Sequence, residues 1–212
     1  MLFDHVGLTA SDQVIMAGDL VVRGPDPAGV LELLRRVAAR SVRGNHEDRL
    51  LRWREGRSHS RGAALGAMHK TTARELSKRD WAMLAELPLW IDLPDHDVRV
   101  VHAGVVPNVP IEQQDPHALM FMRSLDDSGG ALEARGRVLW GQRYDGPPHV
   151  VFGHNALPDV QIHRAATGLD TGCVYGGRLT AMVLRKGERP PPIADRRAVL
   201  VSVPARRRYV GR

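Results

Sequence analysis

Two short segments decide how this chain folds: Gly18-Asp19-Leu20-Val21-Val22-Arg23-Gly24-Pro25 and, further on, Gly44-Asn45-His46-Glu47. Each follows directly on an apolar run, Val14 to Ala17 for the first and Ser41-Val42, more weakly, for the second. An apolar run that ends in a glycine-containing loop predicts a strand with polar residues at its carboxyl end, and open α/β sheets bind their ligands at that end. We therefore expect each loop to follow the carboxyl end of a strand and to contribute residues to a ligand site.

Length and composition set the outer limits. The chain has 212 residues, of which 43% are hydrophobic, so it is long enough to bury a core, and we expect one domain over residues 1–212. The single cysteine, Cys173, excludes an internal disulfide framework. There is no apolar run of about 18 residues, and the first residues resemble neither a signal peptide nor a transit peptide. These features predict a cytoplasmic protein with no membrane partner.

The charge does not point to nucleic acid. The formal net charge is +6, but the basic residues are spread along the chain, with one compact cluster at Arg206-Arg207-Arg208. Nucleic-acid modules concentrate basic charge on one face and interleave aromatic residues, whereas this chain is only 5% aromatic. A positive field that attracts phosphorylated substrates is favoured over nucleic-acid binding, and an arginine-rich solvated surface is an equal alternative.

Several local signals predict helices. Asp26 is a cap for a helix with Pro27 at its first position and an apolar face that includes Leu31 and Leu34. Ser77 with Asp80 resembles a capping box for a helix that ends before Pro88. Further helices are expected after His46 and after Asp115-Pro116, while residues 57–70 give no clear signal and residues 124–137 are expected to form a mobile loop.

Apolar strands are predicted at Val98–Val101 and His149–Phe152, and they lead directly into His102 and Gly153-His154. The last part of the chain predicts antiparallel strands at 179–185 and 198–203, separated by a turn rich in glycine and proline. With no linker to divide it, the chain is expected to form one α/β sandwich, with parallel strands early and antiparallel strands late.

Four of these strand ends present a possible metal ligand: Asp19, Asn45 with His46, His102, and His154. A carboxylate, an amide oxygen and two or three imidazoles suit manganese, iron or zinc better than calcium or a structural zinc. A single histidine at a strand end is more often a hydrogen-bonded structural residue. Four such residues at successive strand ends, each near a glycine that lets the backbone approach a ligand, indicate a metal site.

The ordered series Gly18–Gly24, Gly44–Glu47, His102-Ala103-Gly104 and Gly153-His154 resembles the calcineurin-like metallophosphoesterases, in particular the phosphoprotein-phosphatase branch. Within that branch the chain is most similar to bacterial symmetrical bis(5'-nucleosyl)-tetraphosphatases, because residues 169–181, from Leu169-Asp170-Thr171-Gly172 to Ala181, and Val201–Ala205 fit their pattern. The resemblance runs from residue 8 to residue 205. It implies a β-sandwich flanked by helices, in an αββα arrangement.

The resemblance also implies an activity: hydrolysis of a phosphoester or phosphoanhydride by in-line attack of a metal-bound hydroxide at a two-metal site. Manganese is the expected metal, with iron, zinc, cobalt or nickel as alternatives. Asp19 would bridge the metals, and Asn45, His102 and His154 would complete the shell of the second. His46 would be the general acid and Arg23 the phosphate clamp. Arg123 and Arg143 are further candidates for substrate phosphate, with a plain surface role equally open.

One departure from the family concerns substrate. Protein phosphatases of this branch usually carry an aspartate at the position of Val22, where it orients the general-acid histidine, whereas the tetraphosphatase-like members often carry a small apolar residue. Val22 therefore favours dinucleoside polyphosphates, whose leaving group is a nucleotide phosphate that needs little help from a proton donor. A phosphoprotein substrate with phosphoserine or phosphothreonine is the alternative.

A second departure concerns the first metal. The family opens with a strand that carries Asp-x-His-Gly, and no such motif occurs here, since Asp4 and His5 are adjacent. By this register we expect a chain shortened at its N-terminus that lacks the first strand, with a misplaced start codon favoured over a genuine truncation. The first metal would then keep only Asp19, so we expect one bound metal and weak hydrolysis. An inactive fragment or pseudoenzyme that binds one metal or a partner is the remaining alternative, and two tightly bound metals would exclude it.

Overall fold

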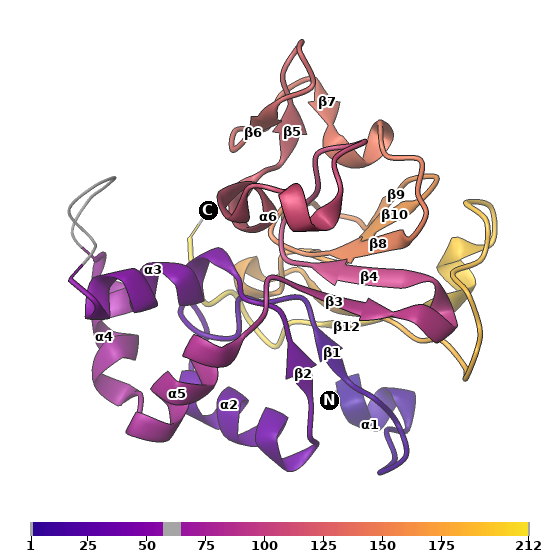
Figure 1. The fold of residues 1–212 in the computed structure, drawn as a ribbon. Coiled ribbons are helices and arrows are strands. Elements are labelled where there is room, and N and C mark those ends of the chain that lie inside the picture. Colours follow the sequence, from indigo (N-terminus) through magenta and orange to yellow (C-terminus); the bar gives the residue numbers. More distant parts are fainter. Residues whose placement is uncertain (1, 57–64, 212) are drawn as a thin grey trace.

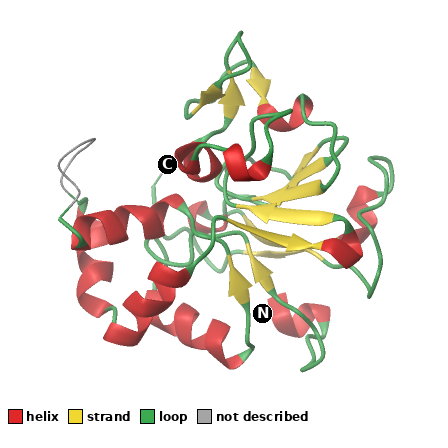
Figure 2. Ribbon diagram, viewed as in Figure 1, coloured by secondary structure: helices red, strands yellow, loops and turns green. Residues whose placement is uncertain are grey.

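Five strands form the main sheet of the computed structural model, which describes residues 2–56 and 65–211. Their order is β3-β4-β8-β10-β9 (Figures 1 and 2). The three central strands β4 (Val98–Val101), β8 (His149–Phe152) and β10 (Ala166–Gly168) run parallel, and β3 (Trp90–Leu93) and β9 (Gln161–Ile162) are antiparallel at the two edges. The strands predicted at 98–101 and 149–152 are thus confirmed with their bounds.

The register of β4 and β8 brings two histidines to one edge of this sheet. Val98 pairs with His149 and Val100 with Val151, so the two strands end side by side. His102 and Gly153-His154 follow immediately, and the backbone N–H of Gly153 donates to the carbonyl of His102 at 2.8 Å. Parallel strands carry their carboxyl ends to the same edge. Histidines that lie far apart in the sequence therefore become neighbours.

The two glycine-rich loops emerge from a second, smaller parallel pair, β1 (Ile15–Met16) and β2 (Arg40–Ser41), with Ile15 paired to Arg40. The crossover between them is helix α2 (Pro27–Arg36), capped by Asp26, whose side chain accepts from Gly29 N. Among the described strands, β1 pairs only with β2. The other edge of β1 borders the cavity described below.

Helices cover the outer side of this pair (Figure 1). They are α3 (Asn45–Arg54), α4 (Ala67–Glu75) and α5 (Lys78–Glu86), and α5 begins at the predicted Ser77–Asp80 capping box. Leu31, Leu50 and Leu84 are completely buried where α2, α3 and α5 meet. No helix in the described part of the chain is both long enough and apolar enough to cross a membrane.

On the main sheet, one face packs around Trp140, Phe152 and helix α6 (Pro116–Phe121). The other face, which includes Val98, Val100 and Val151, lies toward Ile15 and toward Met182. Met182 ends β11 (Arg178–Met182), which pairs antiparallel with β12 (Leu200–Pro204), as the sequence predicted for this region. The short helix α1 (Leu2–Val6) contacts β12. The result is the expected layered sandwich flanked by helices.

One prediction is wrong. Residues 124–137 were expected to be a mobile loop, but this segment contributes β5 (Ser124–Leu125) and β6 (Ala131–Leu132) to a three-stranded antiparallel sheet with β7 (Val138–Leu139). Asp126 closes the glycine-rich turn by accepting hydrogen bonds from Ser128 N at 2.9 Å and Gly130 N at 2.8 Å. Ser124 is fully buried, and its hydroxyl accepts from Gly136 N at 2.7 Å. Side-chain hydrogen bonds therefore order a segment that its glycines alone would leave flexible.

The carboxylate of Glu47 joins the two glycine-rich loops. It is fully buried and accepts three backbone N–H groups: Gly44 at 2.8 Å, Asp19 at 3.0 Å and Val21 at 3.2 Å. Burial raises the pKa of Glu47 to about 7, a rise that these hydrogen bonds oppose. Gly44 has to be glycine here, because a Cβ at this position would overlap the carboxylate of Asp19. The two loops are therefore locked together at backbone level.

Arg196 forms a second buried polar cluster with two residues of the main sheet, His149 of β8 and Thr167 of β10. The guanidinium of Arg196, only 1% exposed, donates to Thr167 Oγ1 at 2.7 Å and to His149 Nε2 at 2.8 Å. Because that ring nitrogen accepts a hydrogen bond, His149 is neutral. Burial, with the charge of Arg196 second, lowers the pKa of His149 to about 3. The cluster therefore excludes a proton that the unfolded chain would bind.

Replacing Glu47 by alanine should destabilise the fold severely. The change leaves three buried N–H groups without an acceptor, each costing about 1–3 kcal/mol, so we expect the free energy of unfolding to fall by at least about 3 kcal/mol. Denaturant titration by circular dichroism measures this. The matched control is Glu86→Ala, at an exposed position on α5, with an expected change within about 0.5 kcal/mol. Equal stability of the two variants would contradict the role of Glu47.

The His149 cluster predicts a pH dependence. Between pH 6.5 and about 3 the unfolded chain binds a proton at residue 149 that the folded chain does not, so this residue makes stability rise with pH across that window. From pH 7 to pH 5 the wild type should lose about 2 kcal/mol more unfolding free energy than His149→Gln. Thr167→Val keeps the imidazole of His149. This variant should have a lower unfolding free energy than wild type at every pH, but the same slope of unfolding free energy against pH. Identical slopes for wild type and His149→Gln would overturn the prediction.

Candidate active site

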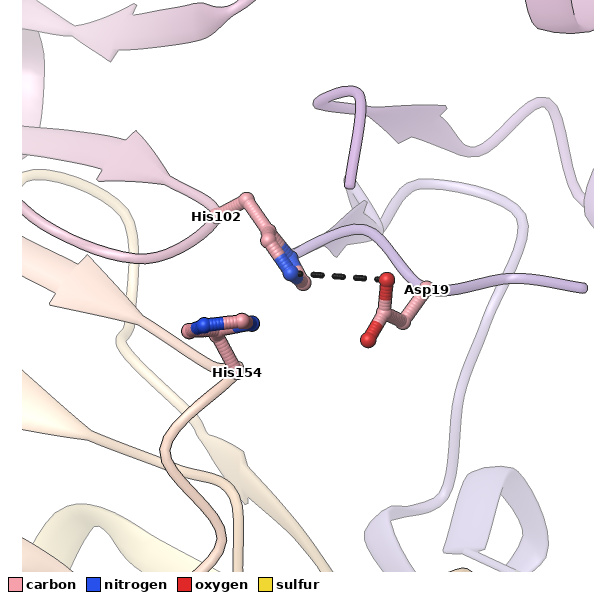
Figure 3. Close-up of side chains that lie close together, drawn as sticks. All are labelled: Asp19, His102 and His154. Atoms are coloured by element: carbon pink, nitrogen blue, oxygen red, sulfur yellow. Dashed lines mark ion pairs between the residues drawn. The ribbon is translucent and has the colours of Figure 1, made fainter. Parts of the chain in front are cut away.

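Three side chains from separate strand ends converge at one point (Figure 3). Asp19 follows β1, His102 follows β4 and His154 follows β8, and their ligand atoms all lie within 4.8 Å of one another. Asp19 Oδ1 is 3.4 Å from His102 Nε2. The two imidazole rings face each other edge-on, with centroids 5.0 Å apart. The predicted ligands Asp19, His102 and His154 are thus brought together.

Backbone carbonyls fix the proton of each ring on the side away from this point. His102 Nδ1 lies 2.7 Å from the carbonyl of Ala17, and His154 Nε2 lies 3.0 Å from the carbonyl of Phe121. A carbonyl can only accept, so these two nitrogens carry the hydrogens. The opposite nitrogens, His102 Nε2 and His154 Nδ1, are left with lone pairs, and each lies 3.0 Å from Asn45 Oδ1.

Four acceptors therefore face one another: a carboxylate oxygen of Asp19, the amide oxygen of Asn45 and one nitrogen from each histidine. Acceptors packed this closely repel one another unless a cation lies between them. Outer-sphere hydrogen bonds of this kind, from imidazole to carbonyl, are typical of metal-ligating histidines. The mixed set of oxygen and imidazole donors fits manganese, iron or zinc. We conclude that these four residues are suited to hold one divalent metal.

The backbone at this site is strained. Asp19, Val22, Arg23 and His154 have positive φ values of 54°, 68°, 59° and 61°. Non-glycine residues rarely adopt this region, and a β-branched valine is a clear outlier there. Strain of this kind persists where surrounding contacts hold it and clusters at functional sites. Its concentration in the Gly18–Pro25 loop and at His154 supports the assignment of both segments to the site.

Burial sets the ionisation of these groups. It raises the pKa of Asp19 to about 7, with Asp170 raising it further, while the His46 N–H bond and the charge of Arg23 act in the opposite direction. Burial also lowers the pKa of His102, and it lowers that of His154 to about 2, with His102 and Arg123 contributing. Both imidazoles are therefore neutral at pH 7, as metal ligation requires.

His46 lies beside this cluster at the start of α3. Its backbone N–H donates to Asp19 Oδ1 at 3.3 Å, and its Nε2 lies 3.7 Å from Asp19 Oδ2. This Nε2 is buried and has no hydrogen-bond partner among the described residues. On the other side of the ring, Nδ1 lies 3.0 Å from His69 Nε2. The free nitrogen of His46 is thus available to an atom bound in the cavity.

The site opens into a cavity of about 1290 Å³. Its polar end is lined by Asp19, Asn45, His46, His102 and His154. Its apolar part extends beside β1, between Val98 and Val151 of the main sheet and residues 179–184 of β11 and the segment after it. The polar end of the cavity and its apolar part are thus one continuous space.

Two of the three predicted phosphate-binding arginines line this cavity. Arg23 donates to Tyr175 Oη at 2.8 Å, and Arg123 donates to the carbonyl of Glu133 at 2.7 Å. These contacts hold both guanidinium groups beside the cavity. Arg143, by contrast, is exposed after a short 3₁₀ turn and is not among the lining residues. The structure does not bring Arg143 to the site.

Sequence reasoning missed several groups near the site. Arg135 lines the cavity and donates to Asn155 Oδ1 at 2.6 Å, and Asp170 and Tyr175 line it as well. The Asp170-Thr171-Gly172 run was a usable signal, because it belongs to the motif that carries the family resemblance. Nothing marked Arg135, whose neighbours Ala134 and Gly136 carry no pattern. His69 was also unassigned, and only the fold places it against His46.

Comparison with known proteins agrees with this geometry. The family model described as calcineurin-like phosphoesterase matches residues 2–188. Relatives named bis(5'-nucleosyl)-tetraphosphatase PrpE (asymmetrical) include one from Oceanobacillus iheyensis, 26% identical over 80% of this chain and 72% of the relative. Another, from Bacillus subtilis, is 27% identical over 79% of this chain and 73% of the relative. These names specify the asymmetrical type, whereas the sequence motifs had suggested the symmetrical one.

Solved structures show the same likeness. A crystal structure provisionally described as a diadenosine tetraphosphatase is 34% identical to this chain, covers 96% of it and 86% of its own chain, and has a TM-score of 0.81. A protein from Pyrococcus horikoshii, 11% identical with a TM-score of 0.54, shares the fold alone. Because the family model matches most of this chain, the chain belongs to the calcineurin-like phosphoesterases, which are hydrolases that act on phosphoester bonds.

Proposed function

We propose that this chain hydrolyses a phosphoanhydride bond in dinucleoside polyphosphates, using a divalent metal held by Asp19, Asn45, His102 and His154. The observation that carries the proposal is the convergence of four acceptor atoms with both imidazole protons tied to backbone carbonyls. The names of the relatives, which specify bis(5'-nucleosyl)-tetraphosphatases, support the substrate class. They favour asymmetrical cleavage.

Each residue has a proposed task. Asp19, Asn45, His102 and His154 would hold a divalent metal, with manganese proposed first, which would supply Lewis acidity toward a phosphoryl oxygen and toward water. Arg23 and Arg123 bind the substrate phosphates, since both line the cavity and a guanidinium matches phosphate geometry. His46 faces the departing oxygen with its free Nε2 and assists its release. The cytoplasm is the proposed compartment, consistent with a nucleotide substrate and a single cysteine.

The number of metals is a separate part of the proposal. Across residues 2–56 and 65–211 one cluster of three possible metal-ligating side chains is found, Asp19 with His102 and His154, whereas the family resemblance implies two metals. We therefore propose one tightly bound metal and slow turnover. Two alternatives stay open: a phosphatase acting on phosphoserine or phosphothreonine, and a binding protein without catalysis.

The first test is a product assay with diadenosine tetraphosphate and Mn²⁺, followed by chromatography. We expect ATP and AMP, with a kcat below the ~10 s⁻¹ typical of enzymes. His154→Ala should remove tight metal binding in calorimetry, which should show one site in the wild type, and should lower turnover at least about 100-fold. Arg143→Ala, outside the cavity, is the matched control and should behave as wild type. Two ADP would indicate symmetrical cleavage, and no metal-dependent product would refute the proposal.

The second test addresses substrate class through Val22. An aspartate at this position should orient His46 as a stronger proton donor, so Val22→Asp should raise kcat/KM on phenyl phosphate and on phosphopeptides relative to diadenosine tetraphosphate. Val22→Asn, similar in size but uncharged, is the control and should not. If wild type already prefers phosphopeptides, the chain is a protein phosphatase and the substrate proposal fails.

A further inference from the structure

The contact between His46 and His69 is a buried pair of imidazoles that come from different helices. His46 begins α3, and His69 lies in the first turn of α4. Their side chains meet with His46 Nδ1 3.0 Å from His69 Nε2, and the ring centroids are 5.1 Å apart with the planes tilted by 42°. His46 is 3% exposed and His69 7%. Water therefore has little access to replace this hydrogen bond.

The two rings differ in their relation to the cavity. His46 lines it, whereas His69 is not among the lining residues and lies behind His46. A substrate in the cavity can thus reach His46 Nε2 but not His69. Any effect of His69 on the reaction has to pass through the ring of His46.

A hydrogen bond between two neutral imidazoles has two arrangements. Either His69 Nε2–H donates to His46 Nδ1, or His46 Nδ1–H donates to His69 Nε2. In the second arrangement the lone pair of His46 Nε2 would face Asp19 Oδ2, which is 3.7 Å away. Two acceptors would then oppose each other in a buried site. In the first arrangement the Nε2–H of His46 points toward the carboxylate and the cavity, which is favourable.

We propose that His69 is a positioning residue that donates to His46 Nδ1, and so holds the ring with its protonated Nε2 facing the bound substrate. This inference rests on the proposed function and refines the role of His46. A neutral imidazole donates a hydrogen bond to the leaving oxygen rather than transferring its proton completely. Such help suffices for a nucleotide phosphate that departs as an anion. His69 thereby selects substrates with good leaving groups.

The direct test is the tautomer of His46, read by two-bond ¹H–¹⁵N correlation on the full chain labelled with ¹⁵N-histidine. In wild type we expect the proton on Nε2. His69→Phe, which fills the space without a donor, leaves Asp19 opposite Nε2, so the proton should stay there, but the ¹⁵N resonance of His46 Nδ1 should shift downfield because this nitrogen loses its hydrogen bond. His69→Gln, whose amide can still donate, should restore the wild-type pattern. Thr72→Val, a buried change on the same helix, should leave the Nδ1 resonance unchanged.

Several outcomes would overturn the inference. A wild-type His46 protonated on Nδ1 refutes it at once, even if His69→Phe fails to fold. An unchanged ¹⁵N resonance of His46 Nδ1 in folded His69→Phe also refutes it. Because this spectrum needs neither added metal nor turnover, failure of the proposed hydrolase function would not be confused with failure here.

A kinetic test follows where turnover is measurable. His69→Phe should lose about tenfold more kcat on phenyl phosphate than on p-nitrophenyl phosphate, because the poorer leaving group depends more on His46. His46→Asn should show the same dependence, and the double variant should lose no more than His46→Asn alone. Equal losses on both esters, or additive losses in the double variant, would contradict action through His46.

Discussion

The site depends on one buried carboxylate. Glu47 accepts hydrogen bonds from the backbone of Asp19, Val21 and Gly44, and so fixes two loops that belong to different βα connections. A single carboxylate can do this because both loops expose unpaired N–H groups at the end of a strand. With the loops fixed, Asp19, Asn45 and His46 have defined positions before any ligand binds. The positive φ values at Asp19 and Val22 persist because these contacts over-determine the backbone.

The other half of the site comes from the main sheet. The parallel register of β4 and β8 ends both strands at one level, so His102 and His154 face the loop fixed by Glu47. Carbonyls of Ala17 and Phe121 then choose the tautomer of each ring. Ligand geometry is thus held by the backbone and does not depend on flexible side chains. Such preorganisation lowers the cost of binding a cation.

The residues near His46 distinguish this chain from the protein phosphatases of the family. Where protein phosphatases usually carry an aspartate, this chain has Val22, and the ring partner of His46 is instead the uncharged His69. In the proposed mechanism, an uncharged partner would make His46 a modest donor, which suits a nucleotide leaving group better than a serine or threonine alkoxide. Arg23 and Arg123 supply positive charge on the walls of the same cavity. These features are the basis on which an anhydride substrate is proposed.

The sequence by itself determined the strands at 98–101 and 149–152, the caps at Asp26 and Ser77, and which residues to propose as metal ligands. These depend on local periodicity, capping chemistry and an ordered motif. It did not determine that residues 124–137 form a small sheet, that Arg143 lies outside the cavity, or that His69 contacts His46. The contacts of His46 with His69 and of Arg135 with Asn155 join separate elements of the fold, whereas the small sheet depends on side-chain hydrogen bonds such as those of Asp126 and Ser124. Only the tertiary structure brings those partners together, because no local preference encodes a contact between distant segments.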